Sequence, residues 1–244
     1  MPDFAEGFHS IHSADIEHVG RVWLRDGTSD PYVFNQIFQT EEFNISTAPQ
    51  FAWVRAAYDR TLAAREVPLV IDCGANIGLS SLYFAKHLPK ARIVGIEPEP
   101  ENVALARRNT QSHPLIEIVE AAVSDQAGSM HLVNPEAEKY AYQVREAGDR
   151  GDRDSPLIEA LTIDTIMQRS GARRNLIVKV DIEGGEQALF RSNVGWLDHT
   201  DLLIIETHDW LFPGEGTSQP LFAAIAGRKF EVIQKGEYIS FFFQ

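Results

Sequence analysis

One short stretch of the chain, V-I-D-C-G-A-N-I-G, combines an acid and two glycines at the end of an apolar run. Gly74 and Gly78 let the backbone bend sharply and approach a ligand closely. Asn76, between them, tolerates left-handed geometry and can donate a hydrogen bond. A dinucleotide site has the pattern G-x-G-x-x-G and binds a pyrophosphate, which Asp72 would repel. The pattern D-x-G-x-x-x-G therefore favours a ligand that carries positive charge.

A second acid, Glu97, ends the next apolar run, at about the 20-residue distance where doubly wound folds place an acid that binds ribose hydroxyls. A carboxylate suits that role because it accepts two hydrogen bonds from a vicinal diol. Sites for NAD and for S-adenosylmethionine share this feature, so Glu97 does not choose between them. Ala122 and Val123, after the following run, are expected to form a small apolar wall beside the base.

Two later stretches, K-V-D-I-E-G-G-E and E-T-H-D-W, supply groups for catalysis. Asp181 ends one apolar run and is followed by Glu183 and Glu186, while Glu206 and His208 end the next run. A histidine between acids at the mouth of a site is a candidate general base, with Asp181 as its orienter or as an alternative base. Asp181, Glu206 and His208 also have the ligand types for a divalent metal. We favour the base and predict no metal.

These stretches lie at the ends of predicted strands that alternate with predicted helices from Pro68 onward. The predicted strands are 68–72, 91–97, 116–123, 175–181, 201–207, 229–234 and 238–243, and the predicted helices are 77–88, 98–110, 183–190 and 219–228. Strand–helix alternation predicts an α/β fold with a parallel sheet covered on both faces. The closing hairpin, around Gly236, makes one strand antiparallel in a doubly wound sheet of about seven strands. Ligands of such sheets bind at the carboxyl ends of the strands.

Two segments stand outside this alternation. Residues 1–66 contain a possible strand, a polar turn and an aromatic-rich helix, and we interpret them as an N-terminal cap packed on a catalytic domain of residues 67–244. Residues 134–155 are polar and charged. A loop of this length within a domain is either functional or disordered, so a substrate lid and a disordered excursion both remain open.

Composition excludes several classes of protein. The net charge of −13 disfavours a nucleic-acid partner and an anionic membrane surface. The single cysteine, Cys73, lies in an apolar run and is expected to be buried. The first residues do not have the pattern of a signal peptide, and no apolar run approaches the ~20 residues of a membrane span. We therefore expect a cytoplasmic protein; its oligomeric state is left open, with a homodimer as one possibility.

The stretches V-I-D-C-G-A-N-I-G-L-S-S, I-E-P-E-P-E-N, V-K-V-D-I-E-G-G-E and L-L-I-I-E-T-H, together with the earlier L-R-D-G-T-S-D-P-Y-V-F-N-Q-I-F, resemble the FkbM family of S-adenosylmethionine-dependent methyltransferases. The resemblance runs from about Val22 to His208, with its motifs in the family's order. It implies a class I methyltransferase fold, Rossmann-like, with strand order 3-2-1-4-5-7-6. It also implies methyl transfer from S-adenosylmethionine to a hydroxyl of a small molecule such as a sugar or natural product, with S-adenosylhomocysteine as the product.

The resemblance also implies roles for particular residues. The methionine-side turn would be formed by Asp72, Gly74, Ala75, Asn76 and Gly78, the ribose and adenine would be held by Glu97, Pro98, Ala122 and Val123, and Asp181 would lie near the methyl group. Asp30 matches a family position near the cofactor pocket, without an assigned role.

Two rival functions remain, and N- or C-methylation in place of O-methylation is a third possibility, because nothing in the sequence names the acceptor atom. An NAD-dependent oxidoreductase would use a similar doubly wound sheet and would have no need for Asp72. A non-catalytic methyltransferase-like module would bind the cofactor without turnover, although the carboxylates at both strand ends argue against it.

Overall fold

The computed structural model describes residues 10–133, 143–146 and 156–244. Its central feature is a seven-stranded sheet in the order β12-β13-β11-β10-β3-β4-β5. The strands are β3 (Leu69–Cys73), β4 (Arg92–Glu97), β5 (Ile116–Glu120), β10 (Asn175–Val180), β11 (Thr200–Glu206), β12 (Phe230–Lys235) and β13 (Tyr238–Phe243). When these seven strands are numbered 1 to 7 in chain order, their order across the sheet from β5 to β12 is 3-2-1-4-5-7-6, as predicted.

Only one strand of this sheet is antiparallel. β13 pairs in the antiparallel sense with both β11 and β12, whereas β3, β4, β5, β10 and β11 pair in parallel. The chain reverses at Gly236, whose φ of 59° is left-handed. The expected mixed sheet is therefore confirmed, and the antiparallel strand lies next to the sheet's edge.

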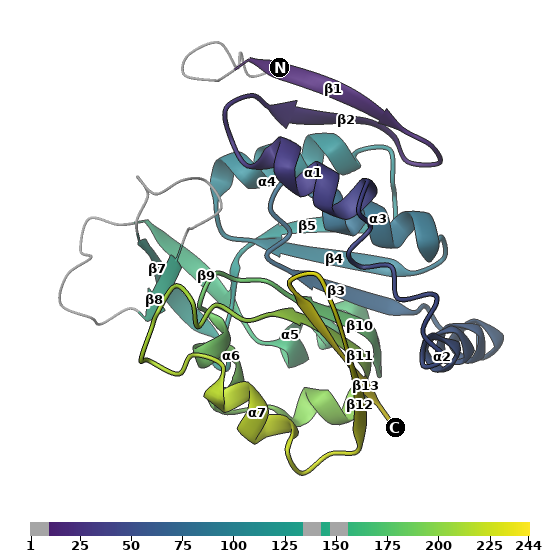
Figure 1. Cartoon of the computed structure of the whole chain (residues 1–244), viewed down its shortest axis with the longest axis vertical. Coiled ribbons are helices and arrows are strands. Elements are labelled where there is room, and N and C mark those ends of the chain that lie inside the picture. The colour runs from purple at the N-terminus through teal and green to yellow at the C-terminus, as the bar shows by residue number, and fades with distance from the viewer. Residues whose placement is uncertain (1–9, 134–142, 147–155) are drawn as a thin grey trace.

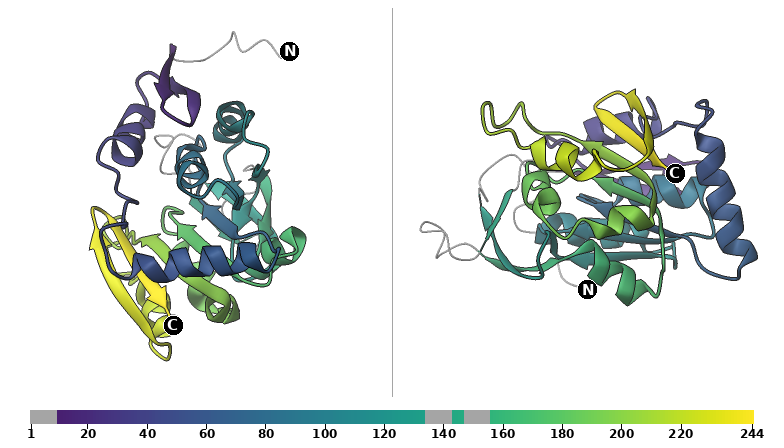
Figure 2. Two further views of the ribbon diagram at one scale, coloured as in Figure 1. Left: turned by 90° about the vertical axis from the view of Figure 1, so that its right-hand side faces the viewer. Right: turned by 90° about the horizontal axis from the view of Figure 1, so that it is seen from below.

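Helices cover both faces of the sheet (Figures 1 and 2). One face carries α1 (Asp30–Phe38), α2 (Phe51–Ala63), α3 (Leu79–His87) and α4 (Pro100–Thr110); the other carries α5 (Ile163–Ser170), α6 (Glu186–Arg191), η1 (Gly195–His199) and α7 (Gln219–Ile225). Alternate residues of each strand face opposite layers. Val70 lies in the first core cluster, and its neighbours Leu69 and Ile71 lie in the second. Both faces of β3 are buried because both layers pack on it.

The N-terminal segment packs on the first face. β1 (Ile11–Ile16) and β2 (Gly20–Arg25) form an antiparallel hairpin, and α1 and α2 follow. Val22 and Leu24 are buried in the same cluster as Val70 and Leu82. Asn109 of α4 also accepts a hydrogen bond from the backbone N–H of Trp23, at 2.7 Å. The described part of the N-terminal segment, from residue 10 onward, thus shares a core with the sheet.

Two details differ from the sequence prediction. The predicted strand 116–123 is broken: β5 ends at Glu120, and β6 (Ala122–Val123) pairs instead with β9 (Leu157–Leu161) in a second sheet of order β6-β9-β7-β8. The other members of that sheet are β7 (Gly128–Val133) and β8 (Gln143–Glu146). The predicted loop 134–155 was therefore wrong at β8, which pairs with β7. The rest of that loop, and with it the choice between lid and disorder, lies outside the described residues.

Candidate cofactor and catalytic site

The glycine turn between β3 and α3 has the predicted geometry. Gly74, Asn76 and Gly78 have φ values of 79°, 48° and 84°. At Gly74 a side chain is excluded because an added Cβ would lie 1.7 Å from the carbonyl oxygen of Asp181. This turn is therefore held against the end of β10, the strand that Asp181 and the second group of acids follow.

Asp72 lies beneath the turn and is fully buried. Its Oδ2 accepts hydrogen bonds of 2.6 Å from the hydroxyls of Ser80 and Ser81. Its Oδ1 lies 3.4 Å from the ammonium nitrogen of Lys179. The positive partner of Asp72 in this structure is thus a side chain of β10, and the carboxylate does not line the cavity described below.

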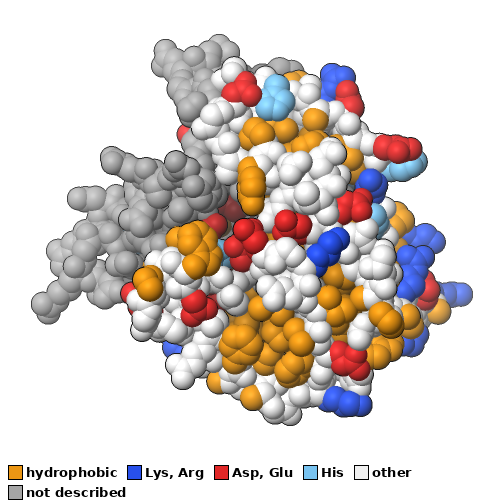
Figure 3. All heavy atoms as spheres, viewed as in Figure 1, with side chains coloured by type: hydrophobic (Ala, Val, Ile, Leu, Met, Phe, Trp, Pro, Cys, Tyr) orange, Lys and Arg blue, Asp and Glu red, His pale blue; other side chains and the backbone are white. Residues whose placement is uncertain are grey.

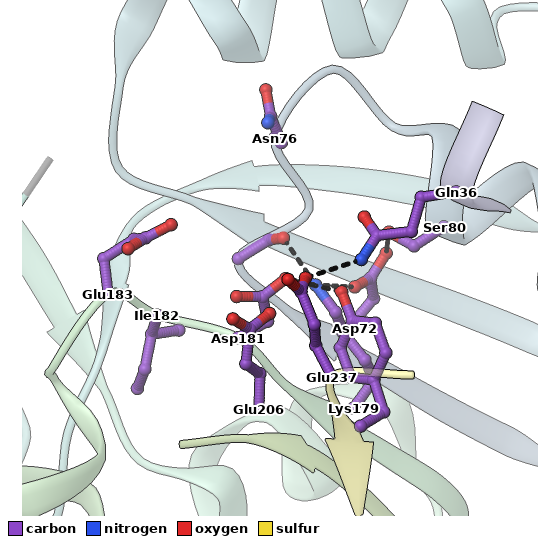
Figure 4. A network of polar contacts seen from close by, with 12 residues as sticks. Gln36, Asp72, Asn76, Ser80, Lys179, Asp181, Ile182, Glu183, Glu206 and Glu237 are labelled. Atoms are coloured by element: carbon purple, nitrogen blue, oxygen red, sulfur yellow. Dashed lines mark hydrogen bonds and ion pairs between the residues drawn. The ribbon is translucent and has the colours of Figure 1, made fainter. Parts of the chain in front are cut away.

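Lys179, on β10, joins the turn to Asp181, the acid that follows this strand (Figure 4). Its Nζ donates a 2.8 Å hydrogen bond to the carbonyl oxygen of Gly74 and lies 3.3 Å from Oδ2 of Asp181. Burial on its own lowers the pKa of Lys179, but Asp181 and Asp72 outweigh it and raise the pKa above its usual value. Lys179 is therefore a fixed positive charge that holds both carboxylates in place.

His208 lies at the centre of a group of carboxylates and is 1% exposed. Its Nδ1 lies 2.9 Å from Oε1 of the buried Glu186. Its Nε2 lies 3.5 to 3.7 Å from oxygens of three further acids, namely Asp181, Glu183 and Glu206. The structure therefore brings together all three of the predicted catalytic residues, and it adds Glu183 and Glu186 to them.

This crowding shifts the pKa values of the group. Burial lowers the pKa of His208, but the hydrogen bond and charge of Glu186, with Asp181 and Glu183, raise it to about 9. Burial and the charge of Asp181 raise the pKa of Glu206 to about 8. The same two causes raise the pKa of Glu183 to about 8. At neutral pH the imidazole is therefore protonated and Glu183 and Glu206 are mostly neutral acids. Asp181, whose pKa is lowered by Lys179 and His208 against the effect of burial, is the ionised acid beside the imidazolium.

The same residues can supply metal ligands. Asp181, Glu206 and His208 each offer one ligand atom, and these atoms lie within 4.8 Å of one another. The oxygen and imidazole donors suit a divalent ion. A metal at His208 would have to displace the proton that its acidic neighbours stabilise. The two roles considered from the sequence, a general base and a metal site, thus fall on the same three residues.

A cavity of about 480 Å³ opens over this group, and the N-terminal segment forms its opposite wall. Asp181, Glu183, Glu206 and His208 line one side, together with Gly74, Ala75 and Asn76 of the glycine turn. Tyr32 and Gln36 of α1 line the other side. Figure 3 shows acidic side chains gathered in the middle of the face seen in Figure 1. The cavity therefore joins the predicted cofactor turn to the predicted catalytic residues.

Glu97 ends β4 on the other side of the turn and is 5% exposed. Its Oε2 accepts a 2.8 Å hydrogen bond from the backbone N–H of Asn76. Its Oε1 accepts one of 3.1 Å from the backbone N–H of Glu99 and one of 3.3 Å from the amide of Asn102. A carboxylate has about four acceptor positions, so three are filled and about one remains for a ligand hydroxyl. For Glu97 to accept hydrogen bonds from both hydroxyls of a ribose diol, one of its three present hydrogen bonds would have to break.

The remaining predicted cofactor residues, Pro98, Ala122, Val123 and Gly78, lie outside the cavity lining. Pro98 follows Glu97 directly, and Ala122 and Val123 are buried in β6. Gly78 is the N-cap residue of α3, where an added Cβ would approach Ala106 of α4 to 3.3 Å. None of these residues lines the cavity. The predicted adenosine side and the predicted catalytic side thus lie on opposite sides of the glycine turn.

Some residues of the site were missed in the sequence. Tyr238 donates a 3.0 Å hydrogen bond to Oδ2 of Asp181 from the antiparallel strand β13. Glu237, beside it, accepts a 2.9 Å hydrogen bond from Gln36. In the sequence, the resemblance that placed Asp30 near the cofactor pocket indicated that the N-terminal segment would approach the site. Partners so distant along the chain have no local pattern.

The strand order and the helices on both faces define a class I methyltransferase fold. The model of the methyltransferase FkbM domain matches residues 72–227. The chain therefore belongs to the FkbM methyltransferase family, as the resemblance indicated.

Two curated relatives are methyltransferases. Methyltransferase sdnD of Sordaria araneosa is 29% identical over 150 residues, which cover 49% of this chain and 58% of that protein. The 2-O-methyltransferase NoeI of Sinorhizobium fredii is 22% identical over 162 residues, which cover 61% and 67%. The match thus spans little more than half of the first relative's length.

A solved structure, the methyltransferase FkbM from Methylobacillus flagellatus, aligns with 16% identity and a TM-score of 0.49. The alignment covers 72% of this chain and 44% of that chain.

Among the described residues, no helix is both long and apolar enough to cross a membrane.

Proposed function

We propose that this protein transfers the methyl group of S-adenosylmethionine to a hydroxyl of a small molecule. One observation carries the proposal: in a chain of the FkbM family, the left-handed glycine turn and the acids around His208 line one cavity. The turn would hold the methionine part of the cofactor, with Glu97 on the ribose and Ala122 and Val123 beside the adenine. The relative NoeI, named as a 2-O-methyltransferase, supports a hydroxyl acceptor.

In the proposed reaction the acceptor oxygen forms a bond to the methyl carbon while the carbon–sulfur bond breaks. The electron pair of that bond stays on sulfur, which gives S-adenosylhomocysteine. The sulfonium is already a strong electrophile, so positioning in the cavity supplies much of the rate. The hydroxyl must also lose its proton to a base.

We propose Glu206 as the group that takes this proton. It lines the cavity, and its pKa of about 8 leaves about a tenth of the carboxyl ionised at pH 7 and half at pH 8, and the ionised form is a strong proton acceptor. His208 was predicted from the sequence as the base, but its pKa of about 9 lies above that of Glu206, so the imidazole is unprotonated less often than Glu206 is ionised. In this proposal His208 is instead a positive neighbour 3.5 Å from Glu206, and it stabilises the carboxylate that accepts the proton. Asp181 holds His208 and Lys179 in place.

Calorimetry tests the cofactor assignment directly. The full chain should bind S-adenosylhomocysteine and not NAD; binding of NAD alone would favour the oxidoreductase. Incubation with labelled S-adenosylmethionine and a panel of hydroxylated acceptors then tests turnover. A chain that binds S-adenosylhomocysteine and methylates none of a broad panel would favour the non-catalytic alternative.

Matched substitutions test the base. We expect Glu206→Gln to lower kcat by about 100-fold or more while the affinity for S-adenosylhomocysteine is kept, because only the proton acceptor is lost. Glu183→Gln is the control, since Glu183 also lies 3.5 Å from His208 and lines the same cavity. Equal losses in both variants would contradict a special role for Glu206.

A further inference from the structure

A buried ion pair in the N-terminal segment stands at the start of a chain of hydrogen bonds that ends at Glu97. Arg25, the last residue of β2, and Asp30, the first of α1, are 1% and 0% exposed. Nε of Arg25 lies 2.8 Å from Oδ2 of Asp30, and Nη2 lies 2.9 Å from Oδ1. The backbone N–H of Arg25 donates to the same carboxylate at 2.8 Å. Asp30 therefore fixes both the side chain and the backbone of Arg25.

The guanidinium reaches across to α4. Its Nη2 donates a 2.8 Å hydrogen bond to Oδ1 of Asn102. Arginine has donors only, so the amide oxygen of Asn102 must face it and the amide NH₂ must point the other way. That NH₂ lies 3.3 Å from Oε1 of Glu97. Arg25 thus determines which end of the Asn102 amide meets the acid.

Packing alone does not account for this pair. Replacing a buried ion pair by apolar residues of similar size is often neutral or stabilising, whereas a charged pair fixes an orientation. Arg25 orients the amide of Asn102, and this amide donates to the carboxylate of Glu97. That carboxylate has about one acceptor position left for a ligand hydroxyl. A small rotation of Glu97 would move that position.

We propose that Arg25, held by Asp30, is a positioning residue for the cofactor's ribose, and that it acts through Asn102 on the carboxylate of Glu97. The proposal rests on the S-adenosylmethionine site proposed above. It gives the N-terminal segment a function beyond covering the sheet: the segment determines how firmly the ribose is held. It also assigns a role to Asp30.

The test compares two ligands, S-adenosylhomocysteine and its 2′,3′-dideoxy analogue, by calorimetry on the full chain. Asn102→Asp keeps the size and the acceptor for Arg25 but faces Glu97 with a carboxylate. We expect it to weaken S-adenosylhomocysteine by about tenfold, the scale of one hydrogen bond to a charged group, and the analogue by less than about twofold. Arg25→Lys should show the same selective loss to a smaller degree, since it keeps the charge and loses the planar fork.

Asn109→Ser is the matched control. Asn109 is also a buried asparagine of α4: it binds the backbone of Trp23 in the N-terminal segment and donates a 2.9 Å hydrogen bond to the carbonyl of Ile77 in the glycine turn. Glu97 accepts its hydrogen bonds from Asn76, Glu99 and Asn102 instead, so a change at Asn109 acts on both ligands alike. It should leave the ratio of the two affinities unchanged. If Asn102→Asp weakens both ligands equally, the role is merely structural and the proposal is overturned.

Two further outcomes are decisive. Adding Asn102→Asp to Glu97→Gln should change the affinity for S-adenosylhomocysteine by less than about twofold, because both act on one contact; additive losses would overturn the proposal. If Asn102→Asp does not fold, Asn102→Ala serves in the same comparison, with a thermal melt as the check. A wild-type chain that binds neither ligand contradicts the proposed function itself, which is distinct from the failure of this inference.

Discussion

The carbonyl oxygen of Asp181 occupies the space that any side chain on Gly74 would need, with a separation of 1.7 Å from an added Cβ. The end of β10 and the glycine turn after β3 are thus in direct backbone contact. Lys179 strengthens this contact by donating a hydrogen bond to the carbonyl of Gly74. The turn proposed to hold the cofactor and the acid proposed to lie near its methyl group are therefore parts of one rigid unit.

Gly74→Ala should destabilise the protein by about 3 kcal/mol or more, since the clash adds to the cost of a left-handed alanine. Urea denaturation measures the change. Gly128→Ala is the control, because an added Cβ there meets nothing within 4 Å and its φ is not left-handed, and it should lie within about 0.5 kcal/mol of wild type. A Gly74→Ala variant as stable as the control would show that the two strand ends can separate.

Lys179→Met should cost about 3–5 kcal/mol of unfolding free energy, because it leaves Asp72 and Asp181 near one another without their shared cation. Adding Asp72→Asn should restore part of the loss. Chemical denaturation of the two single variants and the double variant gives the coupling energy. Additive losses would mean that Lys179 and Asp72 do not act as a pair.

Binding of S-adenosylhomocysteine should weaken as the pH falls below 7. Burial, against the hydrogen bonds from Glu99, Asn76 and Asn102, raises the pKa of Glu97 to about 7. The ionised form, which accepts hydrogen bonds, therefore predominates above that pH and is lost below it. The affinity should fall by about tenfold from pH 8 to pH 6. Calorimetry across this range measures it, and a Glu97→Gln variant should remove this component of the pH dependence.

Turnover should survive removal of divalent metal. His208 carries a stabilised proton at neutral pH, and a metal would have to displace it, so we expect a chelator to change kcat by less than about twofold. The assay compares chelated enzyme with enzyme supplied with Mg²⁺ or Mn²⁺. Loss of activity that Mg²⁺ or Mn²⁺ restores would instead make Asp181, Glu206 and His208 a metal site.

The sequence predicted the sheet and the place of the site because both follow local rules. Apolar runs such as that of β3 form buried strands, and residues just after parallel strands gather at one edge of the sheet. Asp181, Glu206 and His208 were therefore expected together, and they lie together. The second sheet was not predicted, because β6 has only two residues and pairs with a strand far along the chain.

By itself, the sequence determined which chemical groups meet at this edge: glycines that bend the chain, an acid at the ribose position, and acids with a histidine beyond the fourth and fifth strands. Only the tertiary structure decided which partner each charge has. Asp72 faces Lys179, His208 is surrounded by acids, and Arg25 pairs with Asp30. Such partners are set by burial and by contacts between distant segments, and they fix protonation states that no motif encodes.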